Sequence, residues 1–149
     1  MAEPAIPSPA ELIAMIPYAA GLGITVDEAT PELVRGSLRW SPERCTTAGV
    51  MHGGAIMSLA DTIGAVCAFL NLPAGAGTAT VDSTTNFFRG VRDGTLHATA
   101  RPLHAGRSFI AVRTELTDDA GRLVGQTTQT QAVLAPSPPR PPRPPRPAG

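Results

Sequence analysis

The chain has 149 residues, 42% of them hydrophobic and 16% charged, so it can bury the core of one domain and leaves little room for a second. Its formal net charge is zero. Three of the twelve Arg residues follow Leu134, where no acid lies, so the body of the chain is mildly acidic. This balance argues against a basic face for nucleic acid.

Cys45 and Cys67 are the two cysteines, and they form no C-x-x-C pair. This usage favours reduced thiols, as in a cytoplasmic protein. Residues 1–20 contain Glu3 and Glu11 but no Lys or Arg, so they lack the positively charged start of a secretory signal. We therefore expect a cytoplasmic location.

A short helix is predicted near the N-terminus. Ser8 and Glu11 stand at the spacing of a capping box, with Pro9 at the first helical position. Apolar residues follow at helical spacing until Pro17, which we expect to end the helix. We assign this helix to an N-terminal segment, residues 1–20.

Two strands are predicted within residues 23–40, because Ile24 and Val26 alternate with polar residues and a second alternating run covers residues 32–40. Residues 27–31 are expected to form the turn between them. A polar connection, residues 41–49, then leads to the most informative stretch of the chain.

Residues 50–70 form a long apolar segment that opens with His52-Gly53-Gly54 and carries one acid, Asp61. The length approaches that of a membrane span, but the central acid and the strand-like remainder favour a helix enclosed by protein. An unpaired buried carboxylate costs several kcal/mol, on the order of the net stability of a domain. Asp61 should therefore be paired, solvated in a cleft or used in chemistry.

Four stretches of strand character follow a Gly/Ala loop at residues 73–77, and we expect an antiparallel meander with hairpin turns. They cover residues 78–88, 95–104, 108–117 and 123–134. Pro102 indicates a bulge or an edge position. The pattern predicts an α+β fold in which one antiparallel sheet wraps around a central apolar helix. Residues 136–149, rich in Pro and Arg, should form an extended or disordered tail.

The residues between 21 and 134 resemble a known family. The motifs are His52-Gly53-Gly54 with Asp61 nine positions after the His, then Val81-Asp82, Asn86-Phe87-Phe88-Arg89 and Gly106-Arg107-Ser108. Together they resemble the hotdog-fold acyl-CoA thioesterases of the phenylacetic-acid-pathway (PaaI) type. The resemblance implies a hotdog domain over residues 21–135. It also implies a homodimer with continuous sheets, often paired again into a homotetramer.

The resemblance also implies roles for single residues. Gly53 N–H, at the positive end of the helix, would polarise the thioester carbonyl. Asp61 would act as general base or as nucleophile, and the sequence does not choose between these roles. His52 and Thr80 would orient the site and a water, while Gly54 and Thr46 would lie near the substrate; Thr46 stands where many members have Asn. The CoA phosphates would meet Arg89, Gly106, Arg107 and Ser108.

Helix geometry adds an independent argument for an oligomer. Gly53 and Asp61 are eight residues apart on one helix, which is about 12 Å of axial rise. Both groups of one chain therefore cannot touch the same small reacting group. If both are catalytic, a two-fold axis must bring Asp61 of one subunit to the helix start of the other.

Several alternatives remain open at this stage. Asp61 could be a structural acid bonded to nearby hydroxyls, and Arg89 and Arg107 could be ordinary surface residues. The fold could also serve as a non-catalytic module that binds acyl-CoA or an acyl carrier. The tail could recruit a partner. His97 and His104 have no metal-ligand neighbours at suitable spacing, and no Ser lies in a G-x-S-x-G elbow, so we expect neither a metal, a cofactor nor a serine-hydrolase triad.

Overall fold

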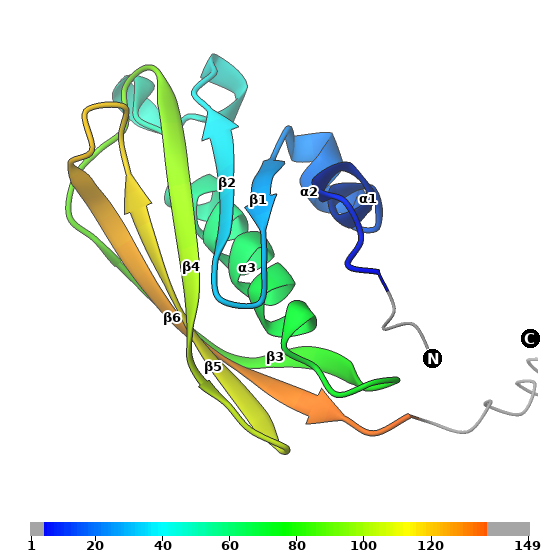
Figure 1. Cartoon of the computed structure of the whole chain (residues 1–149). Coiled ribbons are helices and arrows are strands. Elements are labelled where there is room, and N and C mark those ends of the chain that lie inside the picture. The colour runs from blue at the N-terminus through cyan, green and yellow to red at the C-terminus, as the bar shows by residue number, and fades with distance from the viewer. Residues whose placement is uncertain (1–4, 137–149) are drawn as a thin grey trace, which may run out of the picture.

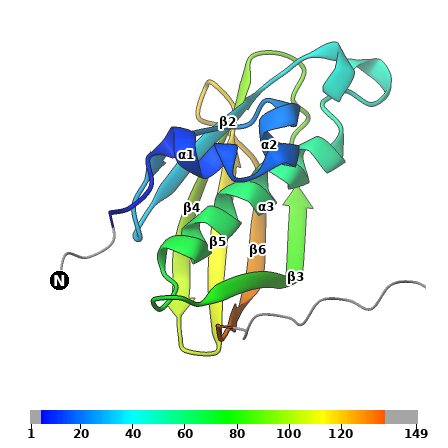
Figure 2. The same cartoon turned by 90° about the vertical axis from the view of Figure 1, so that its right-hand side faces the viewer.

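The structure, a computed structural model, describes residues 5–136. Six strands form one antiparallel sheet in the order β1-β2-β4-β5-β6-β3. The helices and strands are α1 (Pro9–Ala14), α2 (Pro17–Leu22), β1 (Thr25–Ala29), β2 (Val34–Arg39), α3 (Gly53–Leu70), β3 (Gly77–Phe87), β4 (Thr95–Ala105), β5 (Phe109–Thr117) and β6 (Leu123–Leu134). The sheet curves around α3, and α1 and α2 lie on the other side of α3 (Figures 1 and 2). The predicted α+β architecture is confirmed.

The N-terminal helix forms as its capping box predicts. Ser8 Oγ accepts a hydrogen bond from Glu11 N–H, and the Glu11 carboxylate accepts one from Ser8 N–H at 2.7 Å. The second helix, α2, was not predicted, because Pro17 was interpreted only as a stop. Pro17 instead occupies the first position of α2, where the N–H that proline lacks would have no intrahelical partner.

The turn predicted over residues 27–31 is wrong in its position. β1 continues to Ala29, and the turn is closed by Thr30 N–H, which donates to the Leu33 carbonyl at 2.8 Å. A register shift between Val26 and Glu28 breaks the alternation of polar and apolar residues in β1. The sequence of this irregular edge strand therefore lacks the strand pattern and resembles that of a turn.

The predicted four-strand meander is correct only for its last three strands. β3 pairs with β6 at the far edge of the sheet, not with β4 (Figure 1). Residues 88–94 therefore cross the end of the sheet and are not a hairpin turn. The bulge predicted at Pro102 is confirmed by the register shift between Pro102 and His104.

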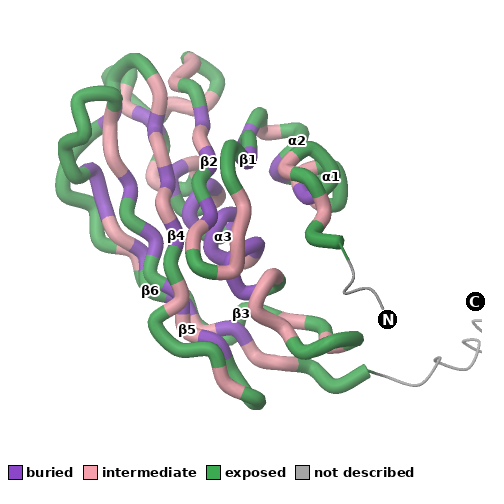
Figure 3. Tube along the Cα trace, viewed as in Figure 1, coloured by how far each residue is buried: buried purple, intermediate pink, exposed green. Residues whose placement is uncertain are grey.

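One side of α3 packs into the sheet and supplies the centre of the core (Figure 3). Leu59 and Ile63 are completely buried, and each contributes about 1.5–3 kcal/mol of burial free energy. The helix is long and apolar enough to cross a membrane by length and composition alone, but 56% of it is buried inside the fold, as in the core helix of a globular domain.

The other side of α3 is not enclosed, contrary to the prediction. Met57, Asp61 and Phe69 are exposed along it, because α1 and α2 cover only part of that side.

The division into residues 1–20 and 21–135 stays a prediction, and α2 spans its boundary. The predicted tail falls on residues 136–149, of which 137–149 lie outside the described residues.

Candidate active site

The start of α3 is held by His52. This residue is the N-cap of the helix, with extended backbone angles, and its Nδ1 accepts a hydrogen bond from Gly54 N–H at 2.8 Å. Its own N–H donates to the Arg44 carbonyl at 2.7 Å. In this bond Nδ1 carries no proton, so a neutral His52 ring has its proton on Nε2. The His52 ring therefore holds the start of α3 in place.

The next N–H group, that of Gly53, is left available. The His52 carbonyl accepts from the N–H groups of Ala55 and Ile56, and Gly54 N–H is taken by the His52 ring. Within residues 5–136, Gly53 N–H has no acceptor. The group lies at the positive end of an 18-residue helix, where it can stabilise an anion.

A hollow of about 380 Å³ opens beside Gly53. The Phe87 ring, at the end of β3, lies 3.4 Å from the place that a Cβ on Gly53 would occupy. The other walls of this hollow are mainly apolar, with one cationic residue at the rim: Val50, Met51, Ile56, Phe88, Arg89 and Gly90. The helix start therefore faces a space that could admit a carbonyl group.

Asp61 lies two turns further along α3 and has partners on two strands. Its Oδ1 accepts hydrogen bonds from Gln129 Nε2 at 3.2 Å and from Thr80 Oγ1 at 3.4 Å. Gln131 Nε2 donates to Thr80 Oγ1 at 2.7 Å. Asp61, Met57, Ser58 and Ser83 line a separate hollow of about 250 Å³. The acid is therefore oriented on one side and open to solvent on the other.

Gln129 and Gln131 are not among the site residues predicted from the sequence. Both are 1% exposed and project from β6 onto the face that packs against α3. With Thr127 they form a period-2 run of polar residues on a core-facing strand. Three buried polar side chains in such a run would have predicted a polar partner inside the fold, and that partner is Asp61.

Gly64 makes room for this arrangement. A Cβ at position 64 would overlap the Gln129 amide, whose Oε1 is buried and has no hydrogen-bond partner among residues 5–136. The small residue one turn after Asp61 therefore lets Gln129 reach the carboxylate.

Within one chain the two halves of the predicted site stay apart. Gly53 contacts Phe87 at the end of β3, whereas Asp61 contacts Thr80 near its beginning. Thr80 and Phe87 are seven positions apart on β3, which is about 23 Å of strand. A single chain therefore places the N–H donor and the carboxylate in different hollows.

The predicted phosphate-binding residues are also apart within one chain. Arg89 follows β3, at the end where Phe87 pairs with Gly125. Gly106, Arg107 and Ser108 form the β4–β5 turn at the other end of the sheet, where Val133 N–H donates to the Ser108 carbonyl. Thr46 is exposed on the loop before α3, and its N–H donates to the Val50 carbonyl.

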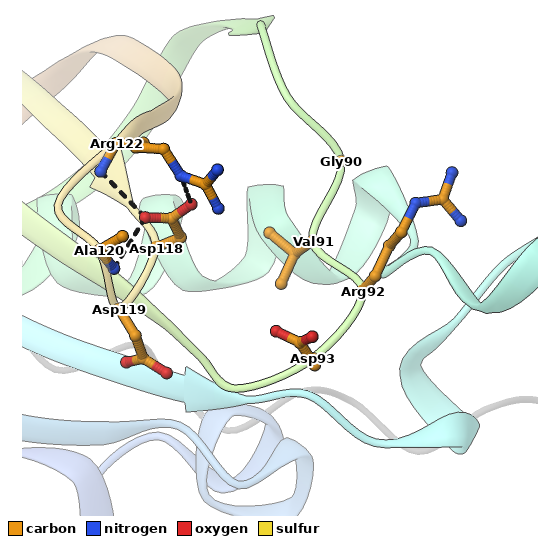
Figure 4. A pocket seen from close by; sticks show the side chains of 8 residues that line it. All are labelled: Gly90, Val91, Arg92, Asp93, Asp118, Asp119, Ala120 and Arg122. Atoms are coloured by element: carbon orange, nitrogen blue, oxygen red, sulfur yellow. Dashed lines mark hydrogen bonds and ion pairs between the residues drawn. The ribbon is translucent and has the colours of Figure 1, made fainter.

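A further hollow, of about 350 Å³, lies between the β5–β6 turn and residues 90–93 (Figure 4). Its acids hold the turn: Asp118 accepts from Arg122 and Ala120, and Asp119 accepts from His97 and Thr95. Backbone donation from Arg122 lowers the pKa of Asp118, and donation by the His97 ring lowers that of Asp119. These carboxylates are structural.

Residues 5–136 contain no group of three or more His, Cys, Asp or Glu side chains arranged for a metal.

A protein-family comparison matches residues 48–125 to the thioesterase superfamily. The chain belongs to the thioesterase superfamily. The match begins just before His52 and covers both Gly53 and Asp61. The solved structure of a Haemophilus influenzae thioesterase superposes with a TM-score of 0.83 at 23% identity, covering 89% of this chain and 94% of that one. The fold is the hotdog thioesterase fold.

Relatives in the thioesterase superfamily support thioester hydrolysis. A Mycobacterium tuberculosis protein named as a candidate esterase is 32% identical over 127 residues, which cover 83% of this chain and 91% of that protein. The 1,4-dihydroxy-2-naphthoyl-CoA hydrolase of Escherichia coli is 31% identical over 86 residues, 58% of this chain and 63% of the hydrolase.

The contact between Gly64 and Gln129 can be tested by stability measurements alone. In the wild-type background, Gly64→Ala should lower the free energy of unfolding by about 1–3 kcal/mol, because the new methyl group overlaps the Gln129 amide. In a Gln129→Ala background the same change should stabilise by up to about 1 kcal/mol through helix propensity. Urea denaturation of the four proteins checks this reversal of sign. Equal effects in both backgrounds would contradict it.

Proposed function

We propose that the protein hydrolyses an acyl-CoA thioester to the free acid and CoA, as a PaaI-like member of its superfamily. The observation that carries this proposal is the pairing of an available Gly53 N–H at the start of α3 with an oriented, solvent-facing Asp61 on the same helix. The hydrolase relative that acts on a CoA thioester supports the choice of substrate class.

Gly53 would polarise the thioester carbonyl. A peptide N–H at a helix N-terminus stabilises the negative charge that develops on the carbonyl oxygen during attack. Glycine at this position leaves the N–H open to the substrate, with Phe87 as the nearest wall. His52 would act by holding the helix start in place, and Gly54 by donating to the His52 ring.

Asp61 would supply the other half of the chemistry. As a general base it takes a proton from water while the water oxygen attacks the carbonyl carbon; the C–S bond then breaks, and the CoA thiolate recovers the proton. As a nucleophile its carboxylate oxygen attacks the carbonyl carbon, the C–S bond breaks and the CoA thiolate leaves a mixed anhydride; water then cleaves this anhydride to the free acid and the Asp61 carboxylate, and its proton passes to the thiolate. Thr80 and Gln129 hold the carboxylate in either case, and Thr80 would also hold the water.

Completing one site requires a second chain. β3 is an edge strand, and it carries the exposed apolar residues Val81 and Phe87, with Phe88 next to it. Antiparallel pairing of two β3 strands about a two-fold axis near Ser83 or Thr84 would place the Thr80 end of one strand beside the Phe87 end of the other. Asp61 of one subunit would then face Gly53 of its partner in a homodimer, or in a homotetramer of two such dimers.

The same pairing would gather the predicted CoA contacts. Arg89 at the end of one β3 would approach the partner's β4–β5 turn, because that turn and the beginning of β3 flank the same end of β6. Arg89 and Arg107 would bind phosphate through planar donors, and the turn at Gly106 and Ser108 would offer backbone N–H groups. The predicted acyl group is an aryl-acyl or a short to medium chain.

Replacing Asp61 tests the catalytic proposal. Asp61→Asn keeps the shape and removes the charge, so kcat should fall by at least about 100-fold in a thiol-release assay with aryl-acetyl, benzoyl, naphthoyl and aliphatic CoA esters. Asp27→Asn, the same change at an exposed acid on β1, at the opposite edge of the sheet from β3, should leave kcat unchanged. Full activity in Asp61→Asn would overturn the mechanism. Saturable binding of acyl-CoA without turnover by the wild type would identify a binding module.

A cysteine introduced near the proposed two-fold axis tests the assembly. Thr84→Cys should form disulfide-linked dimers under mild oxidation, because residues near the axis of an antiparallel pair face their own copies. Thr128 is exposed on β6 and pairs with Thr84, but it lies one strand away from the sheet edge. Thr128→Cys should therefore remain monomeric on a non-reducing gel. Equal cross-linking of both variants, or of neither, would contradict pairing through β3.

A further inference from the structure

An apolar hollow of about 200 Å³ lies between the N-terminal segment around α1 and the second half of α3. Leu12 of α1 and the adjoining Met15 and Ile16 form one wall, and Ala65 and Phe69 of α3 form the other. α1 lies over α3 on the side away from the sheet (Figure 2). The chemistry proposed at Gly53 and Asp61 does not use this space.

The α3 residues that line this hollow share a face of the helix with Asp61. Ala65 and Phe69 lie four and eight residues after Asp61, so all three occupy one face of the helix, over about 12 Å of axial rise. A group attached to a carbonyl at Asp61 and directed toward the helix C-terminus would therefore pass Ala65 and end near Phe69.

The hollow also reaches β3, the strand that supplies Thr80 to Asp61. Thr78 lines the hollow and stands two residues before Thr80, on the same face of the strand. Gln131 links them, because its Oε1 accepts from Thr78 Oγ1 and its Nε2 donates to Thr80 Oγ1. The polar groups thus end at Thr78, and the remaining walls are apolar.

The volume and lining fit one class of occupant. A cavity of about 150 Å³ lined by aliphatic and aromatic side chains accepts a benzene ring, so this hollow can hold an aryl group or a short aliphatic chain. Of the α3 residues that line the hollow, Ala65 is the nearest to Asp61 along the helix and Phe69 is the farthest. The two residues would therefore set whether a substituent enters and how far it extends.

We infer that this hollow binds the acyl substituent of the substrate and that Ala65, Phe69 and Met15 determine the acyl specificity. The inference rests on the proposed thioester hydrolysis and extends it, because it assigns the acyl group to the same subunit that supplies Asp61. The N-terminal helix α1 then becomes part of the substrate site and not only a cover over the core.

The test compares filling and opening of the hollow. Ala65→Leu should lower kcat/KM for phenylacetyl-CoA and octanoyl-CoA at least about tenfold, while acetyl-CoA changes less than about twofold, since a hydrophobic pocket discriminates tenfold or more per methylene. Phe69→Ala should move the best straight-chain substrate to a longer acyl group. Ala14→Leu, the same enlargement on the exposed side of α1, should leave the profile unchanged.

Binding of the non-hydrolysable thioether analogue of phenylacetyl-CoA, followed by calorimetry, separates this inference from the proposed function. If the wild type hydrolyses acyl-CoA and Ala65→Leu keeps the wild-type profile, the inference is overturned and the proposed function stands. If no CoA ester is hydrolysed but the analogue binds at least about tenfold more weakly to Ala65→Leu, the proposed function fails and the acyl site is supported. A variant that changes only the sedimenting mass would identify the hollow as a contact between copies and overturn the inference.

Discussion

The rigid rise of α3 is the constraint on which the rest of the molecule depends. An α-helix cannot bend enough to bring residues eight positions apart to one small group, so Gly53 and Asp61 are about 12 Å apart along its axis. Each is supported by its own surroundings: His52 and Phe87 at one end, Thr80 and Gln129 in the middle. The two groups of the proposed chemistry thus lie at separate positions on one helix, and the edge strand β3 passes both.

Packing explains why α3 can carry an acid at all. The sheet buries Leu59 and Ile63 on one side of the helix, and Asp61 lies on the other, exposed side. The carboxylate therefore keeps contact with water and does not pay the full desolvation penalty of a buried charge. Its second support, Gln129, is buried, and Gly64 provides the space that this amide needs. Stability and the proposed chemistry consequently use opposite faces of the same helix.

The sequence was sufficient for the parts of the structure that depend on local chemistry. The capping box at Ser8, the helix in the apolar segment 50–70 and the bulge at Pro102 follow from neighbouring residues, and the structure has all three. The position of β3 beside β6 depends on long-range pairing, which alternation within a strand does not encode. Gln129 was missed for a related reason, since its neighbour Asp61 is 68 residues away.

The most direct test of an active site shared between two subunits mixes two inactive chains. Gly53→Pro removes the N–H donor at a position that tolerates proline, since it is the first residue of α3 and His52 before it is extended. It is co-expressed with Asp61→Asn, each chain carrying its own affinity tag. If one site combines Gly53 of one subunit with Asp61 of the other, each variant alone is inactive. Random mixing then restores about one quarter of the wild-type thioesterase activity, because half the dimers are mixed and each has one intact site. Mixed dimers that purify through both tags and remain as inactive as either parent would contradict the shared site.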